Sequence, residues 1–246
     1  MSVTGFPENP PTRGGIPSGD AFGGMNAVIG ILAALYYRTS TGKGQYVDIS
    51  LVDSVVSSLC SYTMYYLWDG QVPDRIGNRY KFTYPYDSFK AKDNWYVLAC
   101  GTDEHFRKFA SLMGMPELAD DQRFATRAGR NENYKVLADI INDWSAKQNS
   151  EDIISAVRGI GIPVAPILDF QQLCTNEHMR ARNMFCTIHD DEAGDIVVTN
   201  NPIRMSETDP RISGAVPALG SATEKILSEL GYKTDEIRQL KETGIV

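Results

Sequence analysis

The chain has 246 residues, 42% of them hydrophobic and 22% charged, and a formal net charge of −7. This length suffices for one large domain or two small ones, and an acidic balance without a basic stripe argues against nucleic-acid binding. The longest apolar stretch, from Ala27 to Tyr37, is shorter than the roughly 20 residues of a membrane span, and the N-terminus lacks the pattern of a secretory signal. We therefore expect a cytoplasmic protein with no membrane or nucleic-acid partner.

Regular structure is predicted soon after the N-terminus. Residues 1–19 are rich in proline and glycine and predict a loop. Apolar residues with i, i+3, i+4 spacing over residues 21–38 predict a helix that is buried on most sides. A glycine turn at residues 41–44 follows, and apolar and polar side chains then alternate over residues 45–51, which predicts a strand.

A second helix is predicted from Asp53, as its cap, to about Trp68, with Gly70 as its stop. Residues 73–88 are polar, aromatic and turn-rich, which indicates a linker. The remaining predicted elements are, in order, a strand at 95–100, a helix at 103–114 capped by Thr102, a charged loop at 120–130, helices at 131–147 and 150–157, an extended segment at 162–168, a helical stretch at 169–182 capped by Asp169, a hairpin at 184–199, and helices at 221–230 and 234–243.

This order of elements predicts an α/β protein in three parts. Residues 1–74 form the first part, residues 75–170 a small α+β domain, and residues 171–246 a C-terminal segment. The first and last parts are each too small to bury a core alone. We therefore expect them to pack together or against another part of the protein.

Cysteine and histidine give no sign of a metal site. The four cysteines form no CxxC pair, and the three histidines are far apart in the sequence. We expect free thiols, no metal and no tightly bound cofactor. Cys100 is predicted to be a core thiol, because no histidine partner for it is evident.

The segment SGDAFGG, residues 18–24, is the most informative place in the chain. Asp20 stands where the loop gives way to the helix, and aspartate is among the best N-cap residues. Gly23 and Gly24 in the first turn cost about 1 kcal/mol each relative to alanine, which indicates that another helix or a ligand approaches the backbone closely. A carboxylate beside the free N–H groups of a helix start is most simply explained as a cap, but it also suits a nucleophile, and both roles stay open.

Other candidate residues have a structural explanation that is at least as good. Arg75, Arg79 and Lys81 form the densest basic cluster and suit either phosphate contacts or a solvated loop. Residues 41–44, TGKG, lack the full phosphate-loop pattern, so we predict a tight turn. An aromatic group is expected in core or dimer packing: Tyr62, Tyr65, Tyr66 and Trp68.

The run PSGDAFGGMNAVIGILAALYYRTSTGKGQYVDISLVDS resembles the core of the coenzyme A transferases of the CaiB/BaiF type, family III. The resemblance continues through IGNRY, YDSFKAKDNWYVLAC, GIPVAPILDF, NEHMRARNMF and PALGSATEKILSELGY in the family's order. It implies the C-terminal part of that α/β fold, namely a remnant of a Rossmann-like large domain plus a smaller α+β domain. The family's catalytic aspartate falls on Asp20, whereas the resemblance assigns no residues to CoA binding.

The resemblance also implies an activity. In that family the aspartate exchanges acyl groups and CoA through an aspartyl anhydride and an aspartyl-CoA thioester, so acyl-CoA and a carboxylic acid are the expected substrates. Family members form interlocked homodimers. An α-methylacyl-CoA racemase of the same fold stays an alternative, in which the aspartate works with a histidine as an acid–base pair.

The family's chains are considerably longer than this one. Because the expected Rossmann-like segment before the aspartate has no counterpart here, we expect the C-terminal portion of such a protein. The predicted helix at 21–38 would then expose an apolar face. A third interpretation is therefore a non-catalytic fragment that needs an N-terminal partner chain.

Overall fold

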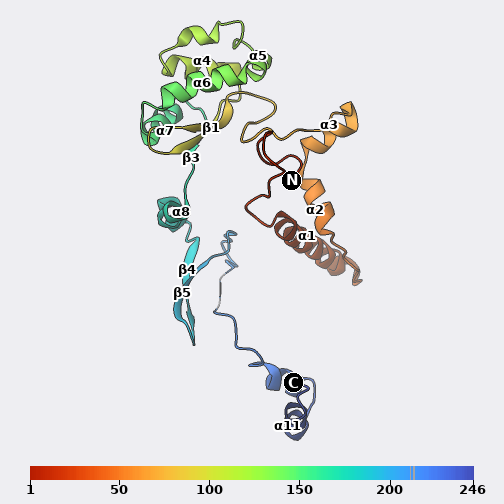
Figure 1. Cartoon of the computed structure of the whole chain (residues 1–246). Helices are drawn as coiled ribbons and strands as arrows, with labels where there is room; N and C mark the ends of the chain where they lie inside the picture. Colours follow the sequence, from red (N-terminus) through yellow and green to blue (C-terminus); the bar gives the residue numbers. More distant parts are fainter. Residues whose placement is uncertain (211, 213) are drawn as a thin grey trace. The chain divides into compact units, whose positions relative to one another are not determined.

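A computed structural model describes residues 1–210, 212 and 214–246. The chain divides into two compact units, Met1–Ile167 and Leu168–Val246 (Figure 1). The further division of the first unit near residue 74 stays a prediction. The α/β class is confirmed, because helices and strands occur in both units.

The first unit begins with a loop and a long helix, α1 (Ser18–Thr41), which ends at Gly42 in the left-handed conformation with φ 72°. The predicted helix is therefore confirmed, but it begins before Asp20 rather than after it. By length and composition alone, this 24-residue helix is able to cross a membrane. The expectation that no apolar segment is long enough was therefore wrong, although the core helix of a soluble protein passes the same test.

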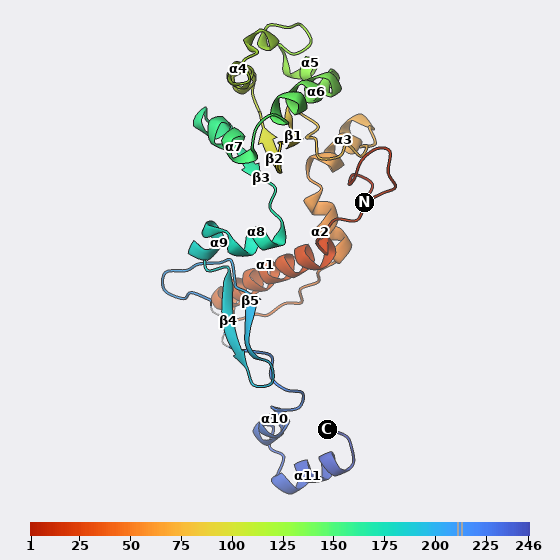
Figure 2. The ribbon, with the colours of Figure 1, turned by 60° about the vertical axis from the view of Figure 1, so that its left-hand side comes forward.

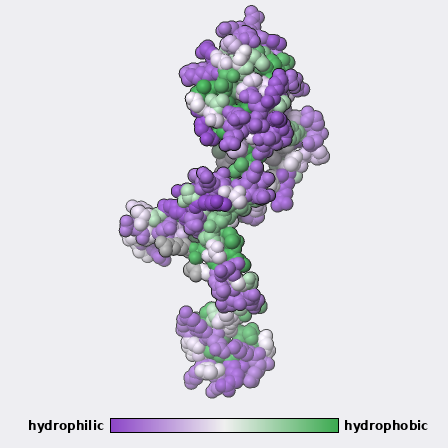
Figure 3. Space-filling model, turned by 90° about the vertical axis from the view of Figure 1, so that its left-hand side faces the viewer, coloured by the Kyte–Doolittle hydropathy of each residue, from purple (hydrophilic) through white to green (hydrophobic). Residues whose placement is uncertain are grey.

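The apolar surface of α1 is largely open to solvent, so the prediction that this helix is buried on most sides was wrong, whereas the exposed apolar face expected for a C-terminal portion is present. Gly23 is its one buried residue. The exposed apolar side chains are Met25, Val28, Ile29, Ile31, Leu32, Leu35, Tyr36 and Tyr37. On the face of the molecule drawn in Figure 3, exposed apolar side chains of the chain as a whole appear in green among polar ones.

The strand predicted at residues 45–51 is absent, and this prediction was wrong. Residues 43–50 instead run beside α1 without strand pairing (Figure 2). Val47 and Ile49 are half-buried while Asp48 is exposed, so the alternation persists. The physical reason is that a strand needs a neighbour for its backbone hydrogen bonds, and no described residue supplies one here.

The second predicted helix is confirmed only in part, because it is broken into two. α2 (Leu51–Ser58) and α3 (Ser61–Asp69) are separated at Cys60, whose φ is 46°. Ser50, rather than Asp53, is the N-cap of α2, since its Oγ accepts the Asp53 N–H at 3.2 Å. Gly70 ends α3 in the left-handed conformation, as expected.

A three-stranded antiparallel sheet follows in the order β1 (Tyr86–Lys90), β2 (Trp95–Ala99) and β3 (Val164–Pro166). Tyr86 pairs with Ala99, and Tyr96 pairs with Pro166. β2 confirms the strand predicted at 95–100. β1 was not predicted, because residues 73–88 read as a linker.

Helices pack with this sheet. They are α4 (Asp103–Leu112), the short 3-10 helix η1 (Pro116–Ala119), α5 (Arg127–Glu132), α6 (Tyr134–Ser145) and α7 (Ser150–Gly159). Thr102 caps α4 as predicted, since its Oγ1 accepts the His105 N–H at 3.1 Å. α5 overlaps the end of the predicted loop at 120–130, which was therefore partly wrong.

The hydrophobic core of the chain lies in this region. It is continuous from Tyr84 to Ile162, and its largest buried apolar side chains include Tyr96, Phe106, Phe109 and Leu137. Outside residues 83–162, the buried described residues are Gly23, Ser54 and Ile237. Residues 83–162 therefore hold nearly all of the chain's interior.

The second unit consists of short elements. They are α8 (Phe170–Thr175), α9 (Glu177–Ala181), the hairpin of β4 (Phe185–Asp190) and β5 (Gly194–Thr199), α10 (Thr223–Glu229) and α11 (Thr234–Glu242). The predicted hairpin is confirmed, with Phe185 opposite Thr199. The cap at Asp169 is confirmed as a capping box with Gln172.

Candidate active site

Asp20 is the third residue of α1, in its first turn. The N-cap position belongs to Pro17, whose carbonyl accepts the Ala21 N–H at 3.0 Å, and no side chain caps the helix. The prediction that Asp20 is the N-cap was therefore wrong. An acidic side chain in the first turn is still stabilised by the positive end of the helix dipole.

The carboxylate of Asp20 is exposed. The backbone N–H groups of Ser18, Gly19 and Asp20 precede the first helical hydrogen bond and have no backbone acceptor among the described residues. Asp20 therefore lies beside unpaired amide donors at the start of a 24-residue helix. Such donors stabilise negative charge that develops on an adjacent oxygen.

The two glycines after Asp20 have different surroundings. A Cβ added to Gly23 would lie 2.3 Å from Leu51 Cδ2, whereas a Cβ on Gly24 would meet nothing within 4 Å. Further along the same helix, a Cβ on Gly30 would lie 2.9 Å from Val47 Cγ1. Gly23 and Gly30 thus allow the extended segment to pack on α1, so the space beside Asp20 that a ligand could use is at Gly24.

A shallow hollow lies between α1 and α2. Asn26, Asp48 and Asp53 line it together with the serines at the start of α2. Asp20 is not among its lining residues. The structure therefore brings Asp48 and Asp53 to one hollow but does not place them with the candidate nucleophile.

The basic cluster is held by its surroundings instead of being solvated loop charge. Arg75 donates to the carbonyls of Phe6, Pro7 and Asn9 at 3.4, 3.3 and 2.8 Å. The Arg79 guanidinium stacks on the Tyr134 ring, and the Lys81 ammonium lies 4.0 Å from the Tyr65 ring centre. The segment is a loop, as expected, but its three basic side chains are half-buried against these partners rather than fully solvated, and the hypothesis of phosphate contacts stays untested.

Burial explains the one cysteine that was weighed as a nucleophile. Cys100 is fully buried, and desolvation raises the pKa of its thiol to about 12. A thiol with so high a pKa is protonated at neutral pH and unreactive. The prediction of a core thiol is confirmed.

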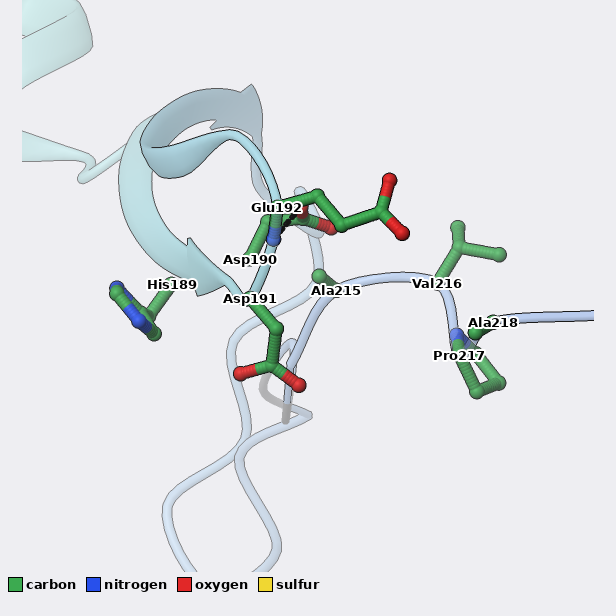
Figure 4. Close-up of a pocket in the computed structure, with 8 residues that line it drawn as sticks. All are labelled: His189, Asp190, Asp191, Glu192, Ala215, Val216, Pro217 and Ala218. Atoms are coloured by element: carbon green, nitrogen blue, oxygen red, sulfur yellow. Dashed lines mark hydrogen bonds between the residues drawn. The ribbon is translucent and has the colours of Figure 1, made fainter. Parts of the chain in front are cut away.

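The β4–β5 turn of the second unit forms another hollow, shown in Figure 4. Asp190, Asp191 and Glu192 face the segment of Val216 and Pro217, and the Asp190 carboxylate accepts the N–H of Glu192 at 3.0 Å. These acidic side chains are solvent-exposed or satisfied by their own turn. Within residues 1–210, 212 and 214–246 there is no cluster that is able to hold a metal ion, and the hollow shows no arrangement for catalysis.

The burial of one charged residue was not predicted from the sequence. Arg130 is fully buried, and its guanidinium donates to the carbonyls of Tyr84 and Phe124 and to the Asp103 carboxylate, at 2.8, 2.9 and 2.6 Å. It lay within a segment predicted to be a charged loop. No signal in the local sequence marks this arginine as buried, because its acceptors belong to residues 84, 103 and 124.

Comparison with known proteins defines the class. The model of CoA-transferase family III matches residues 1–223, and the chain belongs to that family. A succinyl-CoA:mesaconate CoA-transferase of Haloarcula hispanica is 36% identical over 236 residues, which is 95% of this chain and 59% of the relative. An acetyl-CoA:oxalate CoA-transferase of Acetobacter aceti is 35% identical over 92% of this chain and 58% of the relative.

Solved structures agree with this assignment. The crystal structure of a CaiB/BaiF family protein from Brucella suis matches with a TM-score of 0.78 and 32% identity, over 94% of this chain and 60% of that one. The chain thus spans about three-fifths of the length of the proteins it matches. The predicted family and fold are confirmed.

Proposed function

We propose that this chain is the part of a CoA-transferase that carries the nucleophile, Asp20. The observation that supports this most directly is the exposed carboxylate in the first turn of α1, beside unpaired amides and the open side of Gly24. Family membership supports it independently. The function is transfer of CoA from an acyl-CoA thioester to a free carboxylic acid.

The reaction would run in two matched halves. The Asp20 carboxylate attacks the thioester carbonyl, the C–S bond breaks, and CoA leaves as the thiolate. The thiolate attacks the Asp20 carbonyl of the resulting anhydride, which releases the donor acid and forms an aspartyl-CoA thioester. The acceptor carboxylate then displaces the thiolate to give a second anhydride, and attack of the thiolate on the acceptor carbonyl forms the new acyl-CoA and restores Asp20.

Aspartate suits each of these steps. A carboxylate is already ionised at neutral pH, so its attack needs no general base. No proton is gained or lost over the cycle, because every nucleophile and every leaving group is a carboxylate or a thiolate. The tetrahedral oxyanions need donors, and the free N–H groups of the first turn are near the attacking side chain.

The named substrates of the relatives point to a class of acid. Mesaconate and oxalate, in the names of the two relatives described above, are dicarboxylic acids, and so is succinate. We therefore propose a dicarboxylic acid or its monothioester as substrate. The exposed apolar face of α1 supports assembly with further polypeptide, and we propose a homodimer that works in the cytoplasm.

The test is exchange of labelled CoA between two acids, with the chain alone and with the chain co-expressed with the part of the Acetobacter aceti relative that it does not match. Asp20→Ala and Asp20→Asn should lower the exchange rate by about 10³-fold or more, since the group that forms the covalent intermediates is lost. Asp48→Asn, at an exposed carboxylate in the hollow between α1 and α2 that Asp20 does not line, is the matched control. All three variants should keep the melting temperature of the unaltered chain.

Two outcomes would contradict the proposal. One is full exchange in the Asp20→Ala protein. The other is deuterium incorporation at the α-carbon of an acyl-CoA without any CoA exchange, which would mark the racemase reaction. A mass increase of the chain by one CoA, lost in Asp20→Asn, would report the aspartyl thioester directly.

A further inference from the structure

The side chain of Arg79 lies at the border of two neighbouring hollows in the first unit. One, of about 330 Å³, is formed by the loop at residues 6–8, by β1 and by α6. The other, of about 500 Å³, is formed by residues 72–76 and the N-terminal loop. Arg79, Pro7 and Ile76 line both. A guanidinium at such a border is accessible to a small ligand from either side.

The orientation of Arg79 is fixed, but its hydrogen-bonding capacity is unused. The guanidinium carbon lies 3.8 Å from the centre of the Tyr134 ring, which is the geometry of a cation–π contact. In the part of the chain that the structure describes, no carboxylate lies within ion-pair distance of it and no acceptor bonds to it. A guanidinium has five N–H donors, which suit the bidentate binding of a carboxylate or a phosphate.

Arg75 gives a comparison within the same segment. Its guanidinium donates to three backbone carbonyls of the N-terminal loop and so holds that loop in place. Arg75 therefore has a structural role. Arg79, four residues later, makes no such contacts, although it lies in the same two hollows as the loop that Arg75 holds.

The rest of the smaller hollow offers groups of the opposite kind. Asp87 and Glu8 line it, together with the amide of Asn142. Burial raises the pKa of the Asp87 carboxyl, and Arg79 opposes this shift through its charge. One Asp87 oxygen accepts the Ser88 N–H at 2.7 Å. The hollow is therefore lined by one cation and by several hydrogen-bond acceptors.

We propose that this hollow, with Arg79 as its anion-binding group, is a binding site for a small oxyanion that also carries a hydroxyl or amino group. The oxyanion, a carboxylate or a phosphate ester, bonds to the Arg79 fork. The hydroxyl or amino group of the ligand donates to Asp87 or Glu8. Such a ligand satisfies both kinds of group, whereas a plain dicarboxylate would set its second charge against the two acidic side chains.

Titration calorimetry of the whole chain tests this site without reference to catalysis. The probes are glycerate and glycerol 3-phosphate, which represent the two sources of the oxyanion and carry hydroxyl groups, and succinate, which has a second carboxylate in place of a hydroxyl group. At least one of the first two should bind at least tenfold more tightly than succinate. Arg79→Gln should weaken that binding at least tenfold, while Arg107→Gln, at an exposed arginine on α4, leaves it unchanged.

A second pair of variants tests the role of the stacking contact. Tyr134→Phe keeps the ring beneath Arg79 and should keep the affinity, whereas Tyr134→Leu should weaken binding about as much as loss of the arginine. The melting temperature of each variant shows that it is folded. The proposal is overturned if no probe binds at millimolar concentration, or if folded Arg79→Gln binds them as the unaltered chain does. Loss of CoA exchange without loss of probe binding would instead concern Asp20 alone.

Discussion

The two parts of the first unit differ in how they are held together. Residues 83–162 contain a continuous core in which Phe109, Leu137 and Ile141 are fully buried. Residues 1–74 contain the candidate nucleophile, but Gly23 and Ser54 are their only buried described residues. The residues that stabilise the fold and the residue proposed for the chemistry therefore lie in different regions of this chain. It follows that mutations in the first region should be nearly silent in unfolding, whereas mutations in the second should not be.

The largest effect is expected at Arg130. Arg130→Ala removes three hydrogen bonds and leaves the carbonyls of Tyr84 and Phe124 buried without donors, which should cost about 3–5 kcal/mol of unfolding free energy. Urea unfolding measures this cost. Arg107→Ala, at an exposed position on the preceding helix, is the control and should stay within about 0.5 kcal/mol. A small loss in Arg130→Ala would show that the buried guanidinium is not needed to hold α5 to Tyr84, Phe124 and Asp103.

The sequence allowed much of the stable region to be predicted. β2, α4 with its cap and α6 followed from local periodicity and turn residues, as did the β4–β5 hairpin of the second unit. Those elements are specified locally, because their apolar faces and caps lie within a few residues of one another. Arg130 was missed for the opposite reason, since its acceptors come from residue 84, residue 103 and residue 124.

In residues 1–74, a local pattern predicted an element that the structure lacks. Residues 45–51 have the alternation of a strand and keep it in their half-buried Val47 and Ile49, yet no strand among the described residues pairs with them. A strand is a property of two segments, so local alternation predicts it only where a neighbour exists. Asp20 was located correctly at a helix start from its glycines, but its position within the first turn was not, because helix boundaries are the least reliable part of such predictions.

The next largest loss of unfolding free energy is expected at a buried leucine, and an exposed leucine provides the comparison. Leu137 is fully buried in α6, and Leu32 is 60% exposed on α1. Leu137→Ala should destabilise the chain by about 2–5 kcal/mol through lost burial and a cavity, whereas Leu32→Ala should change the unfolding free energy by less than about 0.5 kcal/mol. The same urea titrations serve for both. If Leu32→Ala proved as costly, α1 would have a covering partner in solution, for example a second copy of the chain, and adding concentration dependence to the titration would reveal it.

The smallest change in stability is expected on removing a helix N-cap, and the chain offers two hydroxyl caps for comparison. Thr102 Oγ1 accepts the His105 N–H at 3.1 Å at the start of α4, and Ser50 Oγ accepts the Asp53 N–H at 3.2 Å at the start of α2. Thr102→Ala should cost about 1 kcal/mol, seen as faster amide exchange throughout α4 and α6, because α4 packs into the core through Phe106 and Phe109. Ser50→Ala loses an equivalent hydrogen bond, but α2 buries only Ser54, so its loss should speed exchange within α2 and leave α6 unchanged. Faster exchange in α6 after Ser50→Ala would show that the region of Asp20 and the core unfold as one cooperative unit, and the separation of stability from chemistry would then not hold.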